Sequence, residues 1–251
     1  MRTLWLWLAG LIAAPLSAAQ IDAGQEAYAA GDYVGAIERW QAQVVAEGAT
    51  AGRLAALGNA EWKLGRKGRA MVCWERALLL DPRNAVATAG IRHAQSAGGV
   101  ERPALTWAED YAGFLGANAW LVIATAAFWV ALLGLLIPRL RRGAPSEWQE
   151  KMVVAAATVF LLALPGLWGG HLHARRAVVR QSEVSLRLTP TARGEAIVGI
   201  AEGDVVRTDR AFNDYVRVTT AAGKTGWLQA REIESPWGGG LPANLDAPKA
   251  P

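Results

Sequence analysis

Cysteine and histidine are scarce in this chain, and their scarcity excludes several classes of protein. The 251 residues include one cysteine, Cys73, so no intrachain disulfide can form, and we expect a semi-buried structural thiol inside a helix. Of the three histidines, His171 and His173 stand two apart, a spacing that places them on different faces of a helix. No Ser/His/Asp set, Cys/His nucleophile pair, phosphate-binding loop or zinc signature is recognisable. We therefore predict no enzymatic activity, no metal and no other cofactor.

The excess of positive over negative charge is also small. The formal net charge is +4, and part of it falls in one short loop between two apolar segments. A nucleic-acid-binding protein needs a basic domain face, which this distribution does not supply. We therefore predict no nucleic-acid partner.

The sequence contains a 34-residue pattern that occurs twice within residues 20–84. Four pairs of positions share this offset: Gly24 and Gly58, Gly31 and Gly65, Ala36 and Ala70, and Trp40 and Trp74. Gly31 and Gly65 suit the left-handed backbone at which a helix ends and the chain turns. The tryptophans lie one helical turn after the small alanines, where they can fill the space between two helices.

This period and this pattern resemble the tetratricopeptide repeat, a helix–turn–helix unit with a concave binding face. The second copy, with Leu57-Gly58-Asn59-Ala60 and Leu80-Asp81-Pro82, follows the consensus more closely than the first. Residues 85–97 look like a capping helix, which gives a repeat domain over 20–97. The alternative is an ordinary helical bundle. Two repeats bury little surface, so the array needs its cap, the segment 104–115 or a partner to complete its core.

The resemblance implies a binding groove lined by the first helix of each repeat. By register, the implied lining residues are Gln25, Tyr28, Asn59, Trp62, Lys63 and His93. Asn59 and Lys63 are one helical turn apart and therefore share a helix face. On one face, the two side chains are suited to bind a peptide backbone or a carboxylate. They partly resemble the carboxylate-clamp repeats, and the alternative is a solvated helix face.

Three apolar blocks account for much of the 52% hydrophobic content. Residues 4–14 follow Arg2 and precede small residues, as in a secretory signal, which predicts a signal peptide over 1–19; an uncleaved anchor is the alternative. Residues 117–137 and 152–170 are each long and apolar enough to span a bilayer.

Loop charge predicts the orientation of these spans. Residues 138–151 contain Arg139, Arg141, Arg142 and Lys151, so the loop is expected to be cytoplasmic. The signal peptide independently places the repeats outside, so both flanking domains are expected to be extracytoplasmic, in the periplasm or the exterior. Three basic residues oppose this orientation because they follow the second span: Arg175, Arg176 and Arg180.

The segment 104–115 precedes the first span. Thr106 and Glu109 form a capping-box pattern that starts a helix. Trp107, Tyr111 and Phe114 follow at helical spacing, which suits either the headgroup layer of a membrane or packing against the repeats.

Residues 178–234 change to short apolar runs separated by turn residues, which predicts a small all-β barrel. Leu186-Arg187, Gly203-Asp204, Tyr215-Val216-Arg217-Val218 and Gly223-Lys224-Thr225-Gly226-Trp227-Leu228 resemble the pattern of the bacterial SH3 family. The resemblance implies a surface with Tyr215 and Trp227, where Trp227 is either rim packing or a ligand platform. Residues 235–251, rich in Gly, Pro and Ala, are predicted to be a disordered tail.

The predicted fold is therefore multidomain: an all-α tetratricopeptide array, a transmembrane helical hairpin and a small all-β SH3-like barrel. This order resembles the BatE-type proteins of bacterial aerotolerance operons. The resemblance implies a non-enzymatic scaffold at the bacterial inner membrane that binds von Willebrand A-domain and BatD-type partners, in a complex linked to envelope stress or to a MoxR-type ATPase. The alternative is a wall-binding module, whose SH3-like domain contacts peptidoglycan while the repeats recruit a hydrolase.

Overall fold

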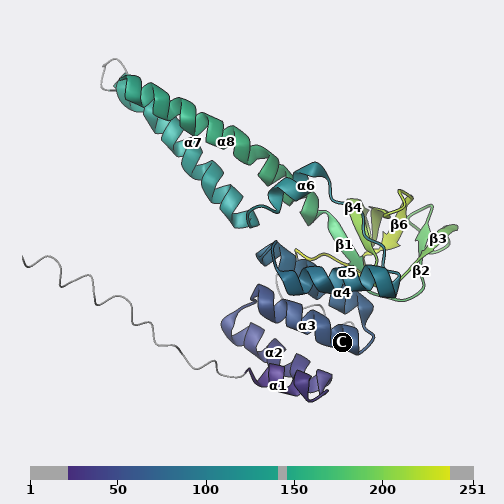
Figure 1. Ribbon diagram of the computed structural model, residues 1–251. Helices are drawn as coiled ribbons and strands as arrows, with labels where there is room; N and C mark the ends of the chain where they lie inside the picture. The colour runs from purple at the N-terminus through teal and green to yellow at the C-terminus, as the bar shows by residue number, and fades with distance from the viewer. Residues whose placement is uncertain (1–21, 141–145, 238–251) are drawn as a thin grey trace, which may run out of the picture.

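The computed structural model describes residues 22–140 and 146–237. Within them the chain forms an array of helices, a long helical hairpin and an antiparallel sheet (Figure 1). The predicted signal peptide 1–19, part of the predicted loop 138–151 and most of the predicted tail 235–251 lie outside the described residues.

Five helices make up the helical array: α1 (Ala23–Ala29), α2 (Tyr33–Glu47), α3 (Ala51–Lys63), α4 (Lys67–Leu80) and α5 (Ala85–Gly98). Each of the first two hairpins turns at a glycine in the left-handed region, Gly31 at φ +82° and Gly65 at φ +76°. Glycine has no Cβ and adopts this conformation at little cost, which is why both copies of the pattern carry glycine there.

The 34-residue offset reflects two matching glycine–tryptophan contacts. A Cβ on Gly24 would stand 2.3 Å from the Trp40 ring, and one on Gly58 would stand 2.5 Å from the Trp74 ring. Both indoles are buried, which confirms that they fill the space between helices. Their N–H groups donate to Asp22 at 2.7 Å and to Asn59 at 3.2 Å. The glycines therefore let each tryptophan lie directly against the preceding helix.

Helices α7 (Ala117–Leu140) and α8 (Glu147–Ala174) pack along one another and project away from the other elements (Figure 1). Both are long and apolar enough to cross a membrane, by length and composition. They run beyond the predicted spans 117–137 and 152–170. Small residues set their contact, since Gly134 faces Val153 and Gly166 faces Trp120.

Helix α6 (Trp107–Ala112) begins with the predicted capping box between Thr106 and Glu109. It lies against α8, where the carbonyl of Ala108 fills the place of a side chain on Gly169. Tyr111 stacks on Trp120 with ring centroids 5.0 Å apart, and its hydroxyl donates to the Leu162 carbonyl at 2.9 Å. Tyr111 therefore packs on the hairpin, an arrangement that neither sequence-based alternative included.

Seven strands form one antiparallel sheet in the order β3-β2-β6-β5-β4-β1-β7. Their bounds are β1 (Arg176–Val179), β2 (Val184–Arg187), β3 (Ala196–Ile200), β4 (Val205–Phe212), β5 (Tyr215–Thr219), β6 (Thr225–Gln229) and β7 (Ile233–Glu234), with a short 3₁₀ helix η1 (Ala230–Glu232) before the last. The chain enters β1 directly from α8, so the sheet begins two residues before the predicted limit of 178.

The sheet does not close into the predicted barrel, because β3 and β7 are its two edges and no ladder joins them within the described residues. Strand β1 gives the reason for the open sheet, because all four of its residues are buried and its two faces pack in different cores. Val178 belongs to the core of the helical array, and its neighbours Ala177 and Val179 belong to the core of the sheet. Helices cover the outer face at this end, so apolar residues there are buried without closure.

Ion pairs reinforce this contact between the array and the sheet. Arg76 of α4 donates to Glu234 of β7 at 2.8 Å, and Arg180, which follows β1, pairs with the same carboxylate. Buried charges of this kind are retained only where they are paired. The helical array and the sheet are thus joined through one shared core and one shared carboxylate.

Candidate functional site

A groove between α3 and α5 encloses a cavity of about 650 Å³. The lining residues are Tyr28, Asn59, Trp62, Lys63, Trp74, Ala85, Val86, Ala89, Gly90 and His93. Five of the six predicted groove residues are among them. The sixth, Gln25, lies exposed on α1 and is not part of the lining.

Two features of α5 create this groove. Asn84 caps the helix, since its side chain accepts a hydrogen bond from the N–H of Ala87 at 3.0 Å. Gly90 then allows α5 to lie close to Trp74, because a Cβ at that position would stand 2.4 Å from the ring. Small side chains on the same face of α5, such as Ala89, leave the space beside Trp74 open.

The wall of the groove is aromatic. The ring of Trp62 lies 5.8 Å from that of Trp74, and the imidazole of His93 meets Trp62 edge-on at 5.7 Å. Tyr28 closes the end nearest α1, where its ring contacts Tyr33 and Trp40 at 5.3 and 6.0 Å. Such a wall suits an apolar or aromatic side chain of a bound segment.

Polar groups stand at the rim of this wall. Lys63 and His93 are exposed, while Asn59 is half-buried and its amide oxygen already accepts the hydrogen bond from the Trp74 indole. The amide N–H₂ group of Asn59 is therefore the donor that this residue offers a ligand. The rim consequently presents hydrogen-bond donors, with Lys63 as its cation, and favours a carboxylate or backbone carbonyl beside the apolar wall.

Sequence reasoning missed the α5 face of the groove apart from His93. Ala85, Val86, Ala89 and Gly90 recur with His93 at the spacing of one helix face, and this signal was available. The position of Trp74 on the groove wall depends on the gap opposite Gly90, which only packing reveals.

The predicted SH3-like surface lies on the sheet. Trp227 pairs in register with Arg187 and Arg217, and Tyr215 pairs with Gln229. Leu228, the neighbour of Trp227, is buried in the sheet core, so the half-buried Trp227 faces outward. The Phe212 ring lies 6.5 Å from Trp227 in an edge arrangement.

Cys73 is not a reactive group in the folded protein. Its side chain is buried, more deeply than the semi-buried thiol expected from the sequence. Burial, with a smaller contribution from the nearby carboxylate of Glu61, raises the pKa of the Cys73 thiol to about 12. A buried thiol in that state is protonated at neutral pH and is therefore a poor nucleophile.

Within residues 22–140 and 146–237, no cluster of three His, Cys, Asp or Glu side chains is placed to hold a metal ion. Comparison with known proteins finds no matching family, no matching curated protein and no matching solved structure.

Proposed function

We propose that this protein is a non-enzymatic membrane scaffold, in which a tetratricopeptide-type groove binds a segment of a partner protein. The observation that carries the proposal is the groove itself. Trp62, Trp74 and Val86 supply apolar surface, and Lys63 adds a cation at the rim. This combination suits an extended peptide with an apolar side chain and a nearby carboxylate.

The position of tryptophans along α8 supports a membrane-spanning hairpin. Trp148 is 75% exposed near one end of the helix and Trp168 is 60% exposed near the other. Twenty residues of helix separate them, about 30 Å, which equals the thickness of a bilayer core. Exposed tryptophans at both boundaries match the aromatic belts of membrane proteins.

Ion pairing weakens the one argument against the proposed orientation, in which loop 138–151 is cytoplasmic and both flanking domains are extracytoplasmic. Of the three arginines that follow α8, Arg176 pairs with Glu109 and Arg180 pairs with Glu234. Arg175 is the exposed member of the three. The basic cluster therefore reflects internal ion pairs of the folded domain rather than a charged flank.

Under this proposal the protein belongs to a bacterial inner-membrane complex of the BatE type. Its partners are von Willebrand A-domain and BatD-type proteins, and the SH3-like sheet provides a second contact. The test is photo-crosslinking in native membranes, with a photoreactive residue replacing Val86 in the groove. Recovery of A-domain proteins supports the proposal, and recovery of cell-wall fragments alone rejects it.

A charge reversal in the groove sharpens this test. Lys63→Glu changes an exposed rim residue and should reduce crosslinked partner several-fold. Lys224→Glu, also exposed but in the turn before β6, is the matched control and should leave recovery unchanged. Asn59→Ala is less suitable because it also removes the hydrogen-bond partner of Trp74. Equal recovery from the Lys63→Glu variant and the unmodified protein rejects the groove as the binding site.

The outward face of the sheet favours a second candidate, a wall-binding module. The exposed Phe212 and the half-buried Trp227 form an aromatic pair there beside Arg217, a surface that suits stacking on a sugar–peptide polymer. Full-length protein in detergent should then sediment with purified sacculi, and Trp227→Ala should abolish this. Absence of sedimentation by the unmodified protein rejects wall binding and leaves the scaffold proposal untouched.

A further inference from the structure

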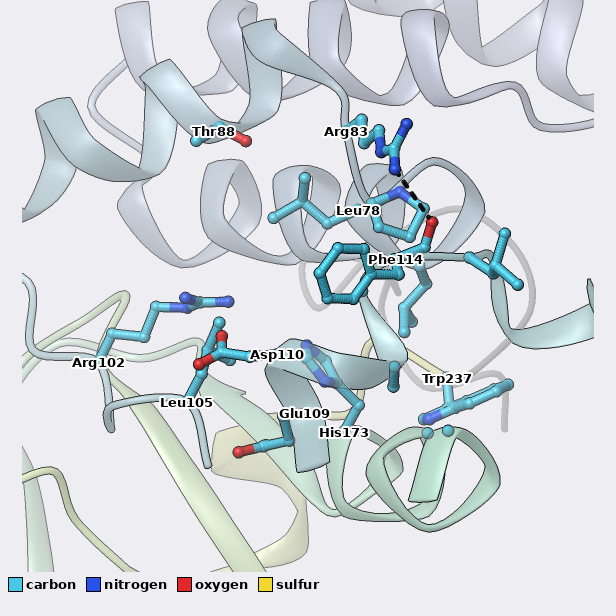
Figure 2. A pocket seen from close by; sticks show the side chains of 17 residues that line it. Leu78, Arg83, Thr88, Arg102, Leu105, Glu109, Asp110, Phe114, His173 and Trp237 are labelled. Carbon is cyan, nitrogen blue, oxygen red and sulfur yellow. Dashed lines mark hydrogen bonds between the residues drawn. The ribbon is translucent and has the colours of Figure 1, made fainter. Parts of the chain in front are cut away.

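A second cavity, of about 420 Å³, lies where the helical array meets the base of the hairpin. Figure 2 shows it between the α4–α5 turn, which carries Arg83, and α6 with the end of α8, which carry Asp110 and His173. Phe114 lies between these two sides, and Trp237 stands at one edge. None of the predicted site residues lines this cavity.

The position of this cavity along α8 indicates its depth relative to the membrane. Gly166 and Gly170, which line it, flank the exposed Trp168 on α8. Leu115, two residues before α7, lines the opposite side. Because Trp168 marks the membrane–water boundary under the proposed function, the cavity opens into the layer of lipid headgroups.

Much of the lining is apolar and open to the surroundings. The large apolar lining residues are Leu78, Leu79, Leu105, Phe114, Leu115 and Trp237. Phe114 is 63% exposed and Trp237 is 45% exposed, so the described part of the chain leaves much of this rim uncovered. An apolar rim at headgroup depth is suited to the upper part of an acyl chain.

Arg83 is the arginine of the cavity lining that has no salt bridge within the described residues. Arg102 pairs with Glu75, and Glu109 pairs with both Arg176 and Arg207. Arg83 and Asp110 also line the cavity, so its charged lining consists of two guanidinium groups and two carboxylates, of which Arg102 and Glu109 are already paired.

We propose that this cavity binds one anionic phospholipid, with the headgroup phosphate at Arg83 and the acyl chains against Phe114 and Trp237. The arginine fork matches the geometry of a phosphate group, and Arg83 has no salt-bridge partner within the described residues, where its guanidinium donates to the Phe114 carbonyl at 3.4 Å. The proposal rests on the membrane-spanning hairpin of the proposed function. It is independent of what the groove binds.

The test uses the full chain, purified in mild detergent and titrated with phosphatidylglycerol or phosphatidylcholine, with bound lipid counted by native mass spectrometry. One phosphatidylglycerol should bind in preference to phosphatidylcholine. Arg83→Gln should weaken it by roughly three- to tenfold, the effect of losing a charge-assisted hydrogen bond at an exposed site. Arg92→Gln, an equally exposed change on α5 outside the cavity, is the control and should bind normally.

A second variant fills the cavity without disturbing the fold. A Cβ on Gly170 would have no neighbour within 4 Å, so Gly170→Leu places its side chain into open space in the cavity. It should lose the bound lipid, whereas Gly52→Leu, a helical glycine that is equally open but distant, should retain it. Thermal unfolding of all variants checks that each is folded.

Three results overturn the proposal: equal affinity for the two lipids, normal binding by Gly170→Leu, or inorganic phosphate that competes at concentrations as low as the lipid. Alkaline carbonate extraction of native membranes separates this proposal from the one on which it rests. A chain that carbonate releases from the membrane overturns both. A chain that stays in the membrane but binds no lipid selectively overturns only the lipid site.

Discussion

Glu109 and Arg176 form an ion pair 2.8 Å long in which neither side chain is exposed to solvent. Glu109 precedes the hairpin and Arg176 follows it, so the pair closes the base of α7 and α8. Arg207 of β4 adds a second contact to the same carboxylate at 3.0 Å. One buried carboxylate therefore ties α6, the end of the hairpin and the sheet together.

Removing one partner of this pair should be costly. Arg176→Met leaves the carboxylate of Glu109 buried with only the partly exposed Arg207, and should lower the free energy of unfolding by about 3–5 kcal/mol. Removing both charges, with Glu109→Leu and Arg176→Met together, should cost less than the two single changes added. Urea unfolding in micelles measures all three variants, and additive effects would contradict a direct interaction.

The same ion pair should make the stability of the protein depend on pH in the acidic range. Burial opposes ionisation of Glu109, but hydrogen bonds from Arg176 and from the backbone of Thr106 outweigh it and lower the pKa from 4.5 to about 2. The unfolded chain binds this proton more readily, so the stabilisation is complete above pH 4.5 and is lost as the pH falls toward 2. Glu109→Gln should therefore show a shallower loss of stability over this range. An unchanged slope would refute the assignment.

The glycine–tryptophan contact of the second hairpin predicts an unusual cost for adding one methyl group. Gly58→Ala brings a Cβ to 2.5 Å from Trp74 and should destabilise the chain by about 1–3 kcal/mol. Gly52→Ala in the same helix has open space and should be neutral or stabilise by up to about 1 kcal/mol. Thermal unfolding compares the two, and similar effects would show that the contact does not constrain residue 58.

Trp74 itself is almost completely buried, with 1% of its surface exposed. Trp74→Ala should cost about 3–5 kcal/mol, as removal of a large buried aromatic does. It should also remove a wall of the groove, so partner crosslinking through Val86 should fall even at temperatures where the variant stays folded. Normal crosslinking by the folded variant would show that the bound segment does not contact Trp74.

The buried thiol offers a probe of unfolding. With its pKa raised to about 12, Cys73 should resist alkylation at pH 8 in the native protein and react once the array unfolds. Because the chain has one cysteine, labelling reports this site alone. Fast labelling of native protein would show that α4 opens more readily than its burial indicates.

Local signals predicted much of the helical part. The turn glycines Gly31 and Gly65 and the capping box at Thr106 depend on neighbours a few residues away. The buried Trp40 and Trp74 meet glycines 16 positions earlier, and the 34-residue repeat of both residues makes this pattern recognisable in one sequence. The repeat register picks out six residues, and five of them line the cavity between α3 and α5, whereas Gln25 does not.

The sheet was harder to predict. Strand β7 has two residues, too few for a pattern, and β1 begins with Arg176, whose charge looked like a membrane flank. Both strands are stabilised by partners distant in the sequence, Glu109 for Arg176 and α4 for β7. The sheet stays open, and is not a barrel, for the same reason: it packs against helices that are distant in the sequence.

The sequence by itself determined the helices, the two long apolar segments and the strand-rich end, because periodicity, run length and turn residues act over a few neighbouring positions. Only the tertiary structure decided that helices cover one end of the sheet, that Arg176 and Arg180 are buried in ion pairs, and that a cavity forms at the base of the hairpin. These features depend on contacts between residues tens to more than a hundred positions apart. No local pattern encodes which of those distant groups will meet.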